Sequence, residues 1–565
     1  MRRAPATNGA KLSSRVSVCH RRVTQGGRAL RECTALGRCT APDRQVKPAL
    51  DLAGARGARS HGIACRLGGG DMRRRTFCAG GLAALGAASI PFHRALAADS
   101  GADIPAVGLD GRELTLKSAD IQDLRAGLRG ELITVAHPDY ESARRLWNPA
   151  FDRHPSLIVR CAGAADVRRA VSFSGARGLL TAVRGGGHSV SGQSGCDRGL
   201  VIDLSRMRAV EVDPVAKLAR VEAGALLGEL DREALAFGLA TPVGTVADTG
   251  VAGLTLGGGV GRLARKFGLT CDNLVAAELV TADGEWRRAS ATENADLLWA
   301  LRGGGGNFGV VTSFTFRLHE VTPVMYGGNL QFPITGGREM LRSLGDIIAA
   351  APDELYVDVA MGTAPENVRW LAFNVCYCGP SGEAERVVGP LRKLGKPRED
   401  TLAATPYDQL QGSGDLRGLS PLGAYGKGGL VYGITPALVD VMVGATESAP
   451  SDGLTMWLQH QGGAISRVPP KASAYFNRGA SHNVGVFDSW QMSAADVERR
   501  TEWVRHTWTQ IEPLTRGQYV NLAATDDRET RVHAAYGDNY PRLAALKKRY
   551  DPNNLFRLNA NIKPA

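Results

Sequence analysis

The sequence predicts an α+β protein built from two modules of different character. From residue 155 to about 318, short β-rich runs alternate with helices and dense glycine-rich turns. From about 321 to 512 the strands become longer and alternate in polarity, with helices between them. Because 565 residues are too many for one hydrophobic core, we expect separate domains at 140–320 and 321–512. Residues 513–565 are expected to return to the first domain.

Hydrophobic periodicity assigns the elements in order. In the first module it predicts strands at 156–161, 179–183, 200–204, 219–222, 274–281 and 310–318, and helices at 165–177, 226–237 and 296–302. In the second module it predicts strands at 355–360, 370–377, 456–461 and 483–487, and helices at 383–394, 436–449 and 494–511. Long alternating strands with amphipathic helices are typical of an antiparallel sheet covered by helices on one face. The polar strand faces suit a substrate cavity.

The first hundred residues carry an export pattern. A basic segment opens at Met72-Arg-Arg-Arg-Thr-Phe77, an apolar Ala/Gly-rich run follows from Cys78 to Ile90, and Ala95-Leu-Ala97 resembles a cleavage site. These features predict a twin-arginine signal peptide at 72–97 and a periplasmic or secreted protein. The run of about 13 apolar residues is too short to span a bilayer, which takes about 20, so a retained membrane anchor is the weaker alternative. We expect residues 1–71 to be untranslated or disordered.

The formal charge of +12 comes from this N-terminal part. Residues 1–71 hold 14 Lys/Arg and 4 Asp/Glu, and residues 72–98 hold 4 Arg and no acidic residue, which leaves 50 basic and 52 acidic side chains beyond them. A nucleic-acid-binding protein keeps its positive charge in its folded part, so we expect no nucleic-acid partner. The five cysteines beyond residue 98 show no Cys-x-x-Cys pair and no zinc spacing, and we expect neither a metal site nor a disulfide framework.

The first of three glycine clusters is Arg184-Gly-Gly-Gly-His-Ser189, directly after a predicted strand. Consecutive glycines allow positive φ and let the main chain approach a ligand closely. Successive free N–H groups in such a turn bind anions and suit a pyrophosphate. His188 would then lie beside the group that the phosphates carry. On this segment alone, a glycine-rich turn followed by a solvent-facing histidine is an equal alternative.

Two further glycine clusters favour a binding function. Residues 241–261 include glycines at 250, 253, 257, 258, 259 and 261, and residues 302–309 read Arg-Gly-Gly-Gly-Gly-Asn-Phe-Gly. The segment 241–261 does not fit the dinucleotide-binding fingerprint of a strand, G-x-G-x-x-G and a helix, and it lacks the Gly-Lys-Ser/Thr of a P-loop. Three such clusters predict main chain laid along a long, phosphate-containing cofactor. Three unrelated surface loops are the alternative.

The motifs together point to a known family. In order along the chain they are Val183-Arg-Gly-Gly-Gly-His-Ser-Val190, Gly250-Val-Ala-Gly-Leu-Thr-Leu-Gly-Gly-Gly-Val-Gly261 and Tyr550-Asp-Pro-Asn-Asn-Leu-Phe-Arg-Leu-Asn-Ala-Asn-Ile562. They resemble the berberine-bridge-enzyme-like FAD-linked oxidases of the vanillyl-alcohol-oxidase/PCMH flavoprotein superfamily. The resemblance covers most of residues 140–565. It implies a PCMH-type FAD-binding domain of two α/β subdomains, a substrate domain, and a C-terminal segment that returns to the FAD domain.

The resemblance also implies roles for individual residues. His188 matches the histidine that bonds covalently to the 8α-methyl carbon of the flavin. The other expected FAD contacts are Arg184, Gly185, Gly186, Gly187 and Ser189 around the pyrophosphate, Asp248, Thr249, Gly250, Gly253, Gly258 and Gly261 along the flavin and its phosphates, Val311 on the adenine side, and Asn559 and Asn561 near the isoalloxazine. A covalent tether keeps the cofactor in an exported protein and raises its potential, which favours hydride abstraction.

Two positions depart from the family pattern. Many members carry a second link through a cysteine where this chain has Val246, so we expect attachment through His188 alone, with Cys271 a packed thiol. Members also often use the second tyrosine of Tyr-x-Asn-Tyr as the general base, and here the motif reads Tyr519-Val-Asn-Leu522. Period-2 alternation along this predicted strand places Tyr519 on the face opposite to Leu522, so Tyr519 is a poor substitute for the base. The remaining candidates for the base are His460, His482, Asn483 and Tyr425.

The resemblance implies an exported FAD-dependent oxidoreductase. It would abstract hydride from a C–OH or activated C–H of a small organic substrate, such as a sugar, an alcohol or a secondary metabolite, with O2 as acceptor and H2O2 as product. A dehydrogenase that uses another electron acceptor is one alternative. A flavin-binding protein with degenerate catalysis is the other, and the leucine at position 522 is the feature in its favour.

Overall fold

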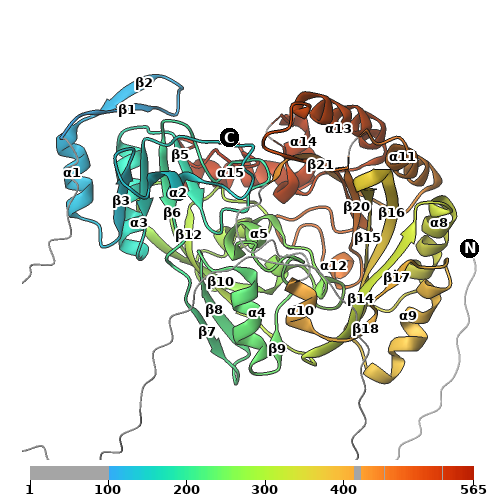
Figure 1. Ribbon diagram of the computed structural model, residues 1–565. Coiled ribbons are helices and arrows are strands. Elements are labelled where there is room, and N and C mark those ends of the chain that lie inside the picture. Colours follow the sequence, from blue (N-terminus) through green and yellow to red (C-terminus); the bar gives the residue numbers. More distant parts are fainter. Residues whose placement is uncertain (1–100, 413–421, 451, 525, 528) are drawn as a thin grey trace, which may run out of the picture. The chain divides into compact units, whose positions relative to one another are not determined.

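The structure is a computed structural model that describes residues 101–412, 422–450, 452–524, 526–527 and 529–565 (Figure 1). The expected signal at 72–97 and the segment 1–71 lie outside the described residues. Two small sheets stand apart from the larger ones: β1 (Ile104–Val107) pairs with β2 (Glu113–Leu116), and β9 (Leu239–Ala240) pairs with β13 (His319–Glu320). Helices α1 (Ser118–Ala126) and α2 (Tyr140–Arg144) flank the first strands of the larger sheets.

A four-stranded mixed sheet positions the first glycine cluster. Its order is β3-β4-β6-β5, with β3 (Glu131–Thr134), β4 (Leu157–Arg160), β5 (Thr181–Arg184) and β6 (Leu200–Asp203). Strands β4, β5 and β6 are parallel, as expected for strands joined through a helix, here α3 (Ala164–Ala176). Leu157 and Ile202 are fully buried on one face and Ile158 and Val201 on the other. This burial explains why β4 and β6 are continuous apolar runs.

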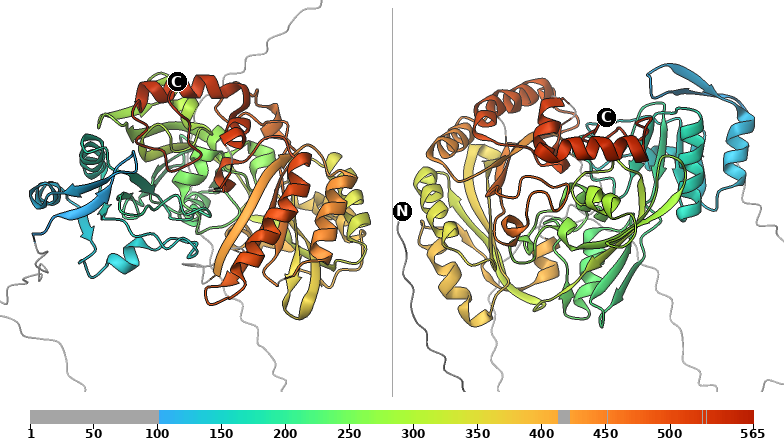
Figure 2. Two further views of the ribbon diagram at one scale, coloured as in Figure 1. Left: turned by 90° about the horizontal axis from the view of Figure 1, so that it is seen from above. Right: turned by 180° about the vertical axis from the view of Figure 1, so that it is seen from behind.

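A five-stranded antiparallel sheet carries the second and third clusters. Its order is β11-β10-β12-β8-β7, with β7 (Val210–Asp213), β8 (Leu218–Glu222), β10 (Leu274–Val280), β11 (Trp286–Ala289) and β12 (Val310–Arg317). The helices of this region are α4 (Leu227–Leu235), α5 (Val251–Gly257), α6 (Ala264–Phe267) and α7 (Ala295–Leu301). The C-terminal helices α14 (Glu529–Tyr536) and α15 (Tyr540–Tyr550) add Tyr536 and Leu543 to the same core cluster. Figure 2 shows this red segment against the green part of the chain.

The eight-stranded antiparallel sheet has the order β17-β14-β16-β15-β20-β21-β19, and β18 pairs with β14. Its strands are β14 (Val324–Pro333), β15 (Leu355–Ala364), β16 (Val368–Tyr377), β17 (Glu399–Asp400), β18 (Ala403–Pro406), β19 (Leu422–Val431), β20 (Thr455–His460) and β21 (His482–Gln491). Helices α8 (Gly337–Ala349), α9 (Ala384–Arg392), α11 (Pro436–Glu447) and α13 (Val497–Ile511) pack on one face through a shared apolar core (Figure 1). The short helices α10 (Tyr407–Gly412) and α12 (Ala464–Arg467) connect elements of this region.

The predicted α+β class with a helix-covered antiparallel sheet is confirmed, and the structure also contains elements that the sequence did not predict. Part of the second glycine cluster forms the short helix α5. The strand β19 was not predicted, because its sequence, Leu422-Gly-Ala-Tyr-Gly-Lys-Gly-Gly-Leu-Val431, has the glycine content of a turn. The interpretation of residues 519–522 as a strand is wrong, since Val520–Leu522 is a 3₁₀ turn.

Within the described residues, no helix combines the length and apolar character needed to cross a membrane.

Candidate flavin site

The three glycine clusters and the C-terminal tail meet around one site. The first and second clusters touch at Gly186, where an added Cβ would lie 2.5 Å from the Cα of Gly250. The second and third are joined by a hydrogen bond from the Gly305 amide to the Leu256 carbonyl, 2.9 Å long. Backbone approach this close requires residues without a side chain. The glycines therefore bring separate segments together, as expected for a shared ligand.

The tail completes this arrangement. The Asn307 side chain, next to the third cluster, donates to the Ala560 carbonyl (3.2 Å) and accepts from the Ile562 amide (3.0 Å). On the other side, the Gln193 amide group donates to the Asn559 carbonyl at 3.4 Å, which links the tail to the loop after His188. The predicted residues at 184–189, 248–261 and 559–561 thus border a common site. The side chain of Val311 is buried in the hydrophobic core, and its contact with adenine stays a prediction.

Unpartnered polar atoms concentrate at this site. His188 Nε2, both carboxylate oxygens of Asp248, and the Oδ1 atoms of Asn559 and Asn561 are buried and have no hydrogen-bond partner. A buried acceptor without a partner costs about 1–3 kcal/mol, so such a group implies a ligand that supplies donors. The hydroxyl groups and ring N–H of FAD are donors of this kind. The residues present therefore fit a flavin dinucleotide.

The side chain of Arg184, which was foreseen as a site residue, and the main chain of Trp147, which was not, position the first cluster. Arg184 Nη1 donates to the carbonyl of Ala143, and Nη2 donates to the carbonyl of Arg144 at 3.2 Å. The guanidinium is therefore occupied at the end of α2, and what Arg184 offers to a pyrophosphate is its main chain. Gly187 has a φ of +72°, a conformation that favours glycine. The Gly187 carbonyl accepts from the Trp147 amide at 3.1 Å.

Sequence reasoning missed Trp147 and Asn148. The Trp147 indole stacks on the His188 ring, with centroids 4.4 Å apart and planes 26° apart. His188 Nε2 lies 3.5 Å from Asp248 Oδ1, so the imidazole is fixed between an aromatic face and a carboxylate. Asn148 Nδ2 donates to the carbonyls of Val190 (2.7 Å) and Ala424 (2.8 Å), which ties the histidine loop to β19. The segment has no motif, and no signal in a single sequence would have revealed these contacts.

Tyr519 and Leu522 lie on the same side of the 3₁₀ turn rather than on opposite faces. Both belong to one apolar cluster, which also contains the fully buried Cys271. The Tyr519 hydroxyl accepts from the Gly259 amide (3.0 Å) and from Asn521 Nδ2 (2.9 Å), and burial raises the pKa of Tyr519 to about 12. Burial keeps the Tyr519 phenol neutral, and its oxygen already accepts two hydrogen bonds that hold the glycine loop. Tyr519 is therefore poorly suited to act as a base.

His460 and His482 form a buried cross-strand pair. Their rings stack with centroids 5.1 Å apart, at the ends of β20 and β21. Burial lowers the pKa of His482 to about 3, and burial together with the neighbouring His482 and Arg265 holds the pKa of His460 well below 6.5. Arg265 Nη1 lies 3.0 Å from His460 Nε2, which must be the acceptor because a guanidinium only donates. Both rings are neutral near pH 7, and His482 Nε2 has no partner.

This pair makes stability depend on pH. In the unfolded chain an imidazole binds a proton below about pH 6.5, whereas folded His482 stays neutral until about pH 3. The unfolded state therefore binds more protons in this window, and the free energy of unfolding falls as the pH drops from about 6.5 towards 3. His482→Phe, which keeps a ring against His460, should reduce this dependence by up to about 1.4 kcal/mol per pH unit. Urea unfolding at pH 7 and pH 5 measures the difference. The control His506→Phe, on the exposed side of α13, should leave it unchanged.

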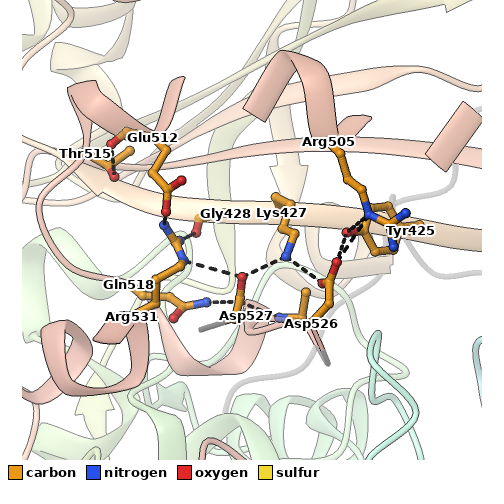
Figure 3. Close-up of polar contacts among 11 residues, drawn as sticks. Tyr425, Lys427, Gly428, Arg505, Glu512, Thr515, Gln518, Asp526, Asp527 and Arg531 are labelled. Carbon is orange, nitrogen blue, oxygen red and sulfur yellow. Dashed lines mark hydrogen bonds and ion pairs between the residues drawn. The ribbon is translucent and has the colours of Figure 1, made fainter. Parts of the chain in front are cut away.

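Tyr425 belongs to an ion-pair network on the helix-covered side of the large sheet (Figure 3). Its hydroxyl donates to Asp526 Oδ2 (2.7 Å), and Lys427 Nζ lies 2.6 Å from Asp526 Oδ1 and 2.9 Å from Asp527 Oδ1. Arg505 contacts Asp526 at 3.3 Å, and Arg531 contacts Asp527 at 3.4 Å. The network fastens the segment after Leu522 to β19. Tyr425 therefore has structural partners, and the structure places it away from the Leu522 side of the strand.

Comparison with known proteins agrees with this geometry. Residues 155–290 match the family described as FAD binding domain, and residues 518–563 match the family described as berberine and berberine like. An FAD-linked oxidoreductase of Bacillus subtilis is 33% identical over 448 residues, covering 77% of this chain and 97% of its own. The (R)-6-hydroxynicotine oxidase of Paenarthrobacter nicotinovorans is 31% identical over 455 residues, covering 77% and 97%.

Solved structures show the same fold. The crystal structure of 6-hydroxy-D-nicotine oxidase from Arthrobacter nicotinovorans superposes with a TM-score of 0.71 at 30% identity, covering 78% of this chain and 98% of that one. Fold and site together define a flavin-dependent oxidoreductase with a PCMH-type FAD-binding domain. The chain belongs to the berberine-bridge-enzyme-like FAD-linked oxidoreductases.

Proposed function

We propose that the protein is an exported oxidase that holds FAD covalently through His188 alone. It oxidises a C–OH or activated C–H group of a small organic molecule, such as a sugar, an alcohol or a secondary metabolite, and passes the electrons to O2 to give H2O2. The observation that carries the proposal is the meeting of three glycine clusters around His188, with the unpartnered acceptors Asp248, Asn559 and Asn561 beside it. A relative named (R)-6-hydroxynicotine oxidase supports a small organic substrate.

Different residues of the protein would bind the phosphates and the flavin ring of FAD. Main-chain amides of the glycine clusters bind the phosphates, and Asp248, Asn559 and Asn561 accept hydrogen bonds from the flavin portion. Bound FAD supplies the hydride acceptor. Val246 provides no thiol, so the histidine is the proposed attachment point. The export part of the proposal rests on the segment 72–97.

The position of Leu522 favours a second candidate, a flavin-binding protein without turnover. Leu522 lies against β19, with its Cβ 3.5 Å from where a Cβ on Gly428 would be, and it offers no proton acceptor there. His482 pairs with Val431 on the Tyr425 side of β19, away from Leu522, and its low pKa makes it a weak base.

One experiment separates the possibilities. The purified holoprotein is mixed anaerobically with a broad panel of alcohols, sugars and phenolic metabolites while the flavin absorbance is followed. Bleaching by at least one compound, then rapid recolouring and stoichiometric H2O2 when air is admitted, is the expected result. A reduced flavin that persists for minutes in air would make the protein a dehydrogenase. A flavin that no compound bleaches would favour the second candidate.

A further inference from the structure

The helix-free face of the eight-stranded sheet carries a stacked aromatic pair. Trp457 on β20 and Phe487 on β21 have ring centroids 4.0 Å apart and planes 16° apart. Two strand positions beneath the rings are glycines. A Cβ on Gly485 would lie 2.7 Å from Trp457 and 2.8 Å from Phe487, and a Cβ on Gly426 would lie 2.0 Å from Phe487. Glycine is unfavourable in a strand interior, and here it makes room for the two rings.

This face is turned towards the flavin-binding part of the chain. Two contacts establish its direction: Leu522 lies beside Gly428, two residues along β19 from Gly426, and Gln459 Nε2 donates to the Val260 carbonyl at 3.4 Å. Side chains on the opposite face, such as Val359 and Leu458, are completely buried under the helices. The Trp457–Phe487 pair therefore faces the second glycine cluster and does not point into the apolar core.

The two rings differ in exposure. Phe487 is 8% exposed, whereas Trp457 is only partly buried. Residue 360, the partner of Trp457 on β15, is an alanine and is also partly exposed. A single methyl leaves space beside the indole on the side away from β21. Phe487 thus supports one side of Trp457, and the rest of the indole is available to a ligand.

Most of the polar groups that border the pair lie on the side of Gln459 and Asn483. Asn483 Nδ2 donates to Gln459 Oε1 at 3.5 Å, and Asn483 Oδ1 is buried without a partner. On the other side, Thr455, the cross-strand partner of Phe487, offers a single hydroxyl, and the remaining neighbours are glycine, alanine and leucine, which offer no side-chain hydrogen bonds. A sugar, with hydroxyl groups around its whole rim, would leave most of them unpaired here. A flat aromatic ring with one polar edge matches the surface.

We propose that Trp457 is the platform on which the substrate ring stacks, and that the substrate carries a planar aromatic or heteroaromatic ring with a hydrogen-bond donor directed at Asn483. This inference rests on the proposed function and narrows its substrate class. Offset stacking on an indole adds to the hydrophobic gain of burial, so the preference should be for aromaticity and not merely for apolar surface.

The test compares matched ligands on the FAD-loaded protein. Aromatic alcohols, phenols and hydroxypyridines are titrated beside their ring-saturated analogues, such as 4-hydroxybenzyl alcohol and 4-(hydroxymethyl)cyclohexanol, with glucose and cellobiose as sugars. Binding is read by calorimetry and by the shift of the flavin absorbance, with no turnover needed. The wild type should bind the best aromatic ligand about tenfold more tightly than its saturated analogue. In Trp457→Leu this difference should disappear while flavin content is unchanged.

Trp503→Leu is the control variant, because Trp503 lies on α13 against the opposite face of the sheet, and it should keep the preference. Phe487→Leu, a second variant, should weaken the preference partly, since it removes the support of the indole. Equal binding of aromatic and saturated ligands, tighter binding of the sugars, or an undiminished preference in Trp457→Leu would overturn the inference while the flavin is still reducible. A protein that binds no FAD would instead overturn the proposed function on which the inference rests.

Discussion

Replacing His188 with alanine is expected to release all of the flavin from acid-denatured protein. The wild type should precipitate yellow, and its intact mass should exceed that of the polypeptide by one FAD. His188→Ala should give a colourless pellet, a yellow supernatant and the mass of the plain polypeptide. The physical reason is that the imidazole, held between Trp147 and Asp248, is the proposed point of covalent attachment, and Val246 supplies no second one.

Under native conditions the same variant should still bind FAD. The glycine clusters and the acceptors of Asp248, Asn559 and Asn561 are unchanged, and they are the proposed non-covalent contacts of FAD. The flavin potential should fall, because the electron-withdrawing linkage is gone. The control is His533→Ala, on α14, which should retain the colour and the added mass. Free flavin in the supernatant of acid-treated wild type would contradict covalent attachment and leave FAD binding intact.

Much of the site could be predicted because its motifs are local. A run such as Gly185-Gly-Gly187 indicates close backbone approach, and together with the two other glycine clusters and the tail motif it predicts a cofactor site. Strands and helices with clear periodicity, such as β10 and α11, also begin and end near their expected residues. The candidate catalytic side chains, in contrast, could be named from the sequence without being placed.

What could not be predicted depends on contacts between distant segments. The glycine-rich β19 is a strand because Phe487, Leu522 and Trp508 fill the space that its own side chains do not, and no local pattern reveals this. The 3₁₀ turn at Val520–Leu522 is held by hydrogen bonds from Asn521 to Leu254 and to Tyr519, one of them to a residue 267 positions away. Tertiary contacts of this kind override local preference.

Lys547→Met is expected to lower the free energy of unfolding by about 3–5 kcal/mol, the usual cost of leaving one charge of a buried pair without its partner. Lys547 and Asp551 are both completely buried, with Nζ 2.6 Å from Oδ2. The same ammonium donates to the Asn307 carbonyl (2.8 Å) and the Phe556 carbonyl (2.9 Å), so it connects the third glycine cluster to the tail. Methionine fills a similar volume but can replace none of these bonds.

The Lys547→Met substitution should weaken FAD binding as well as lower the stability of the fold. Asp551 also accepts from the amides of Leu555 (2.7 Å) and Phe556 (2.9 Å), and it thereby fixes the turn that leads to Asn559 and Asn561. With Lys547 gone, that turn carries an unpaired buried carboxylate, and FAD occupancy should fall together with stability. Urea unfolding and the flavin-to-protein absorbance ratio measure the two effects. Lys548→Met, one residue along on the exposed side of α15, should change neither, and equal behaviour of the two variants would show that the buried pair does not hold the tail.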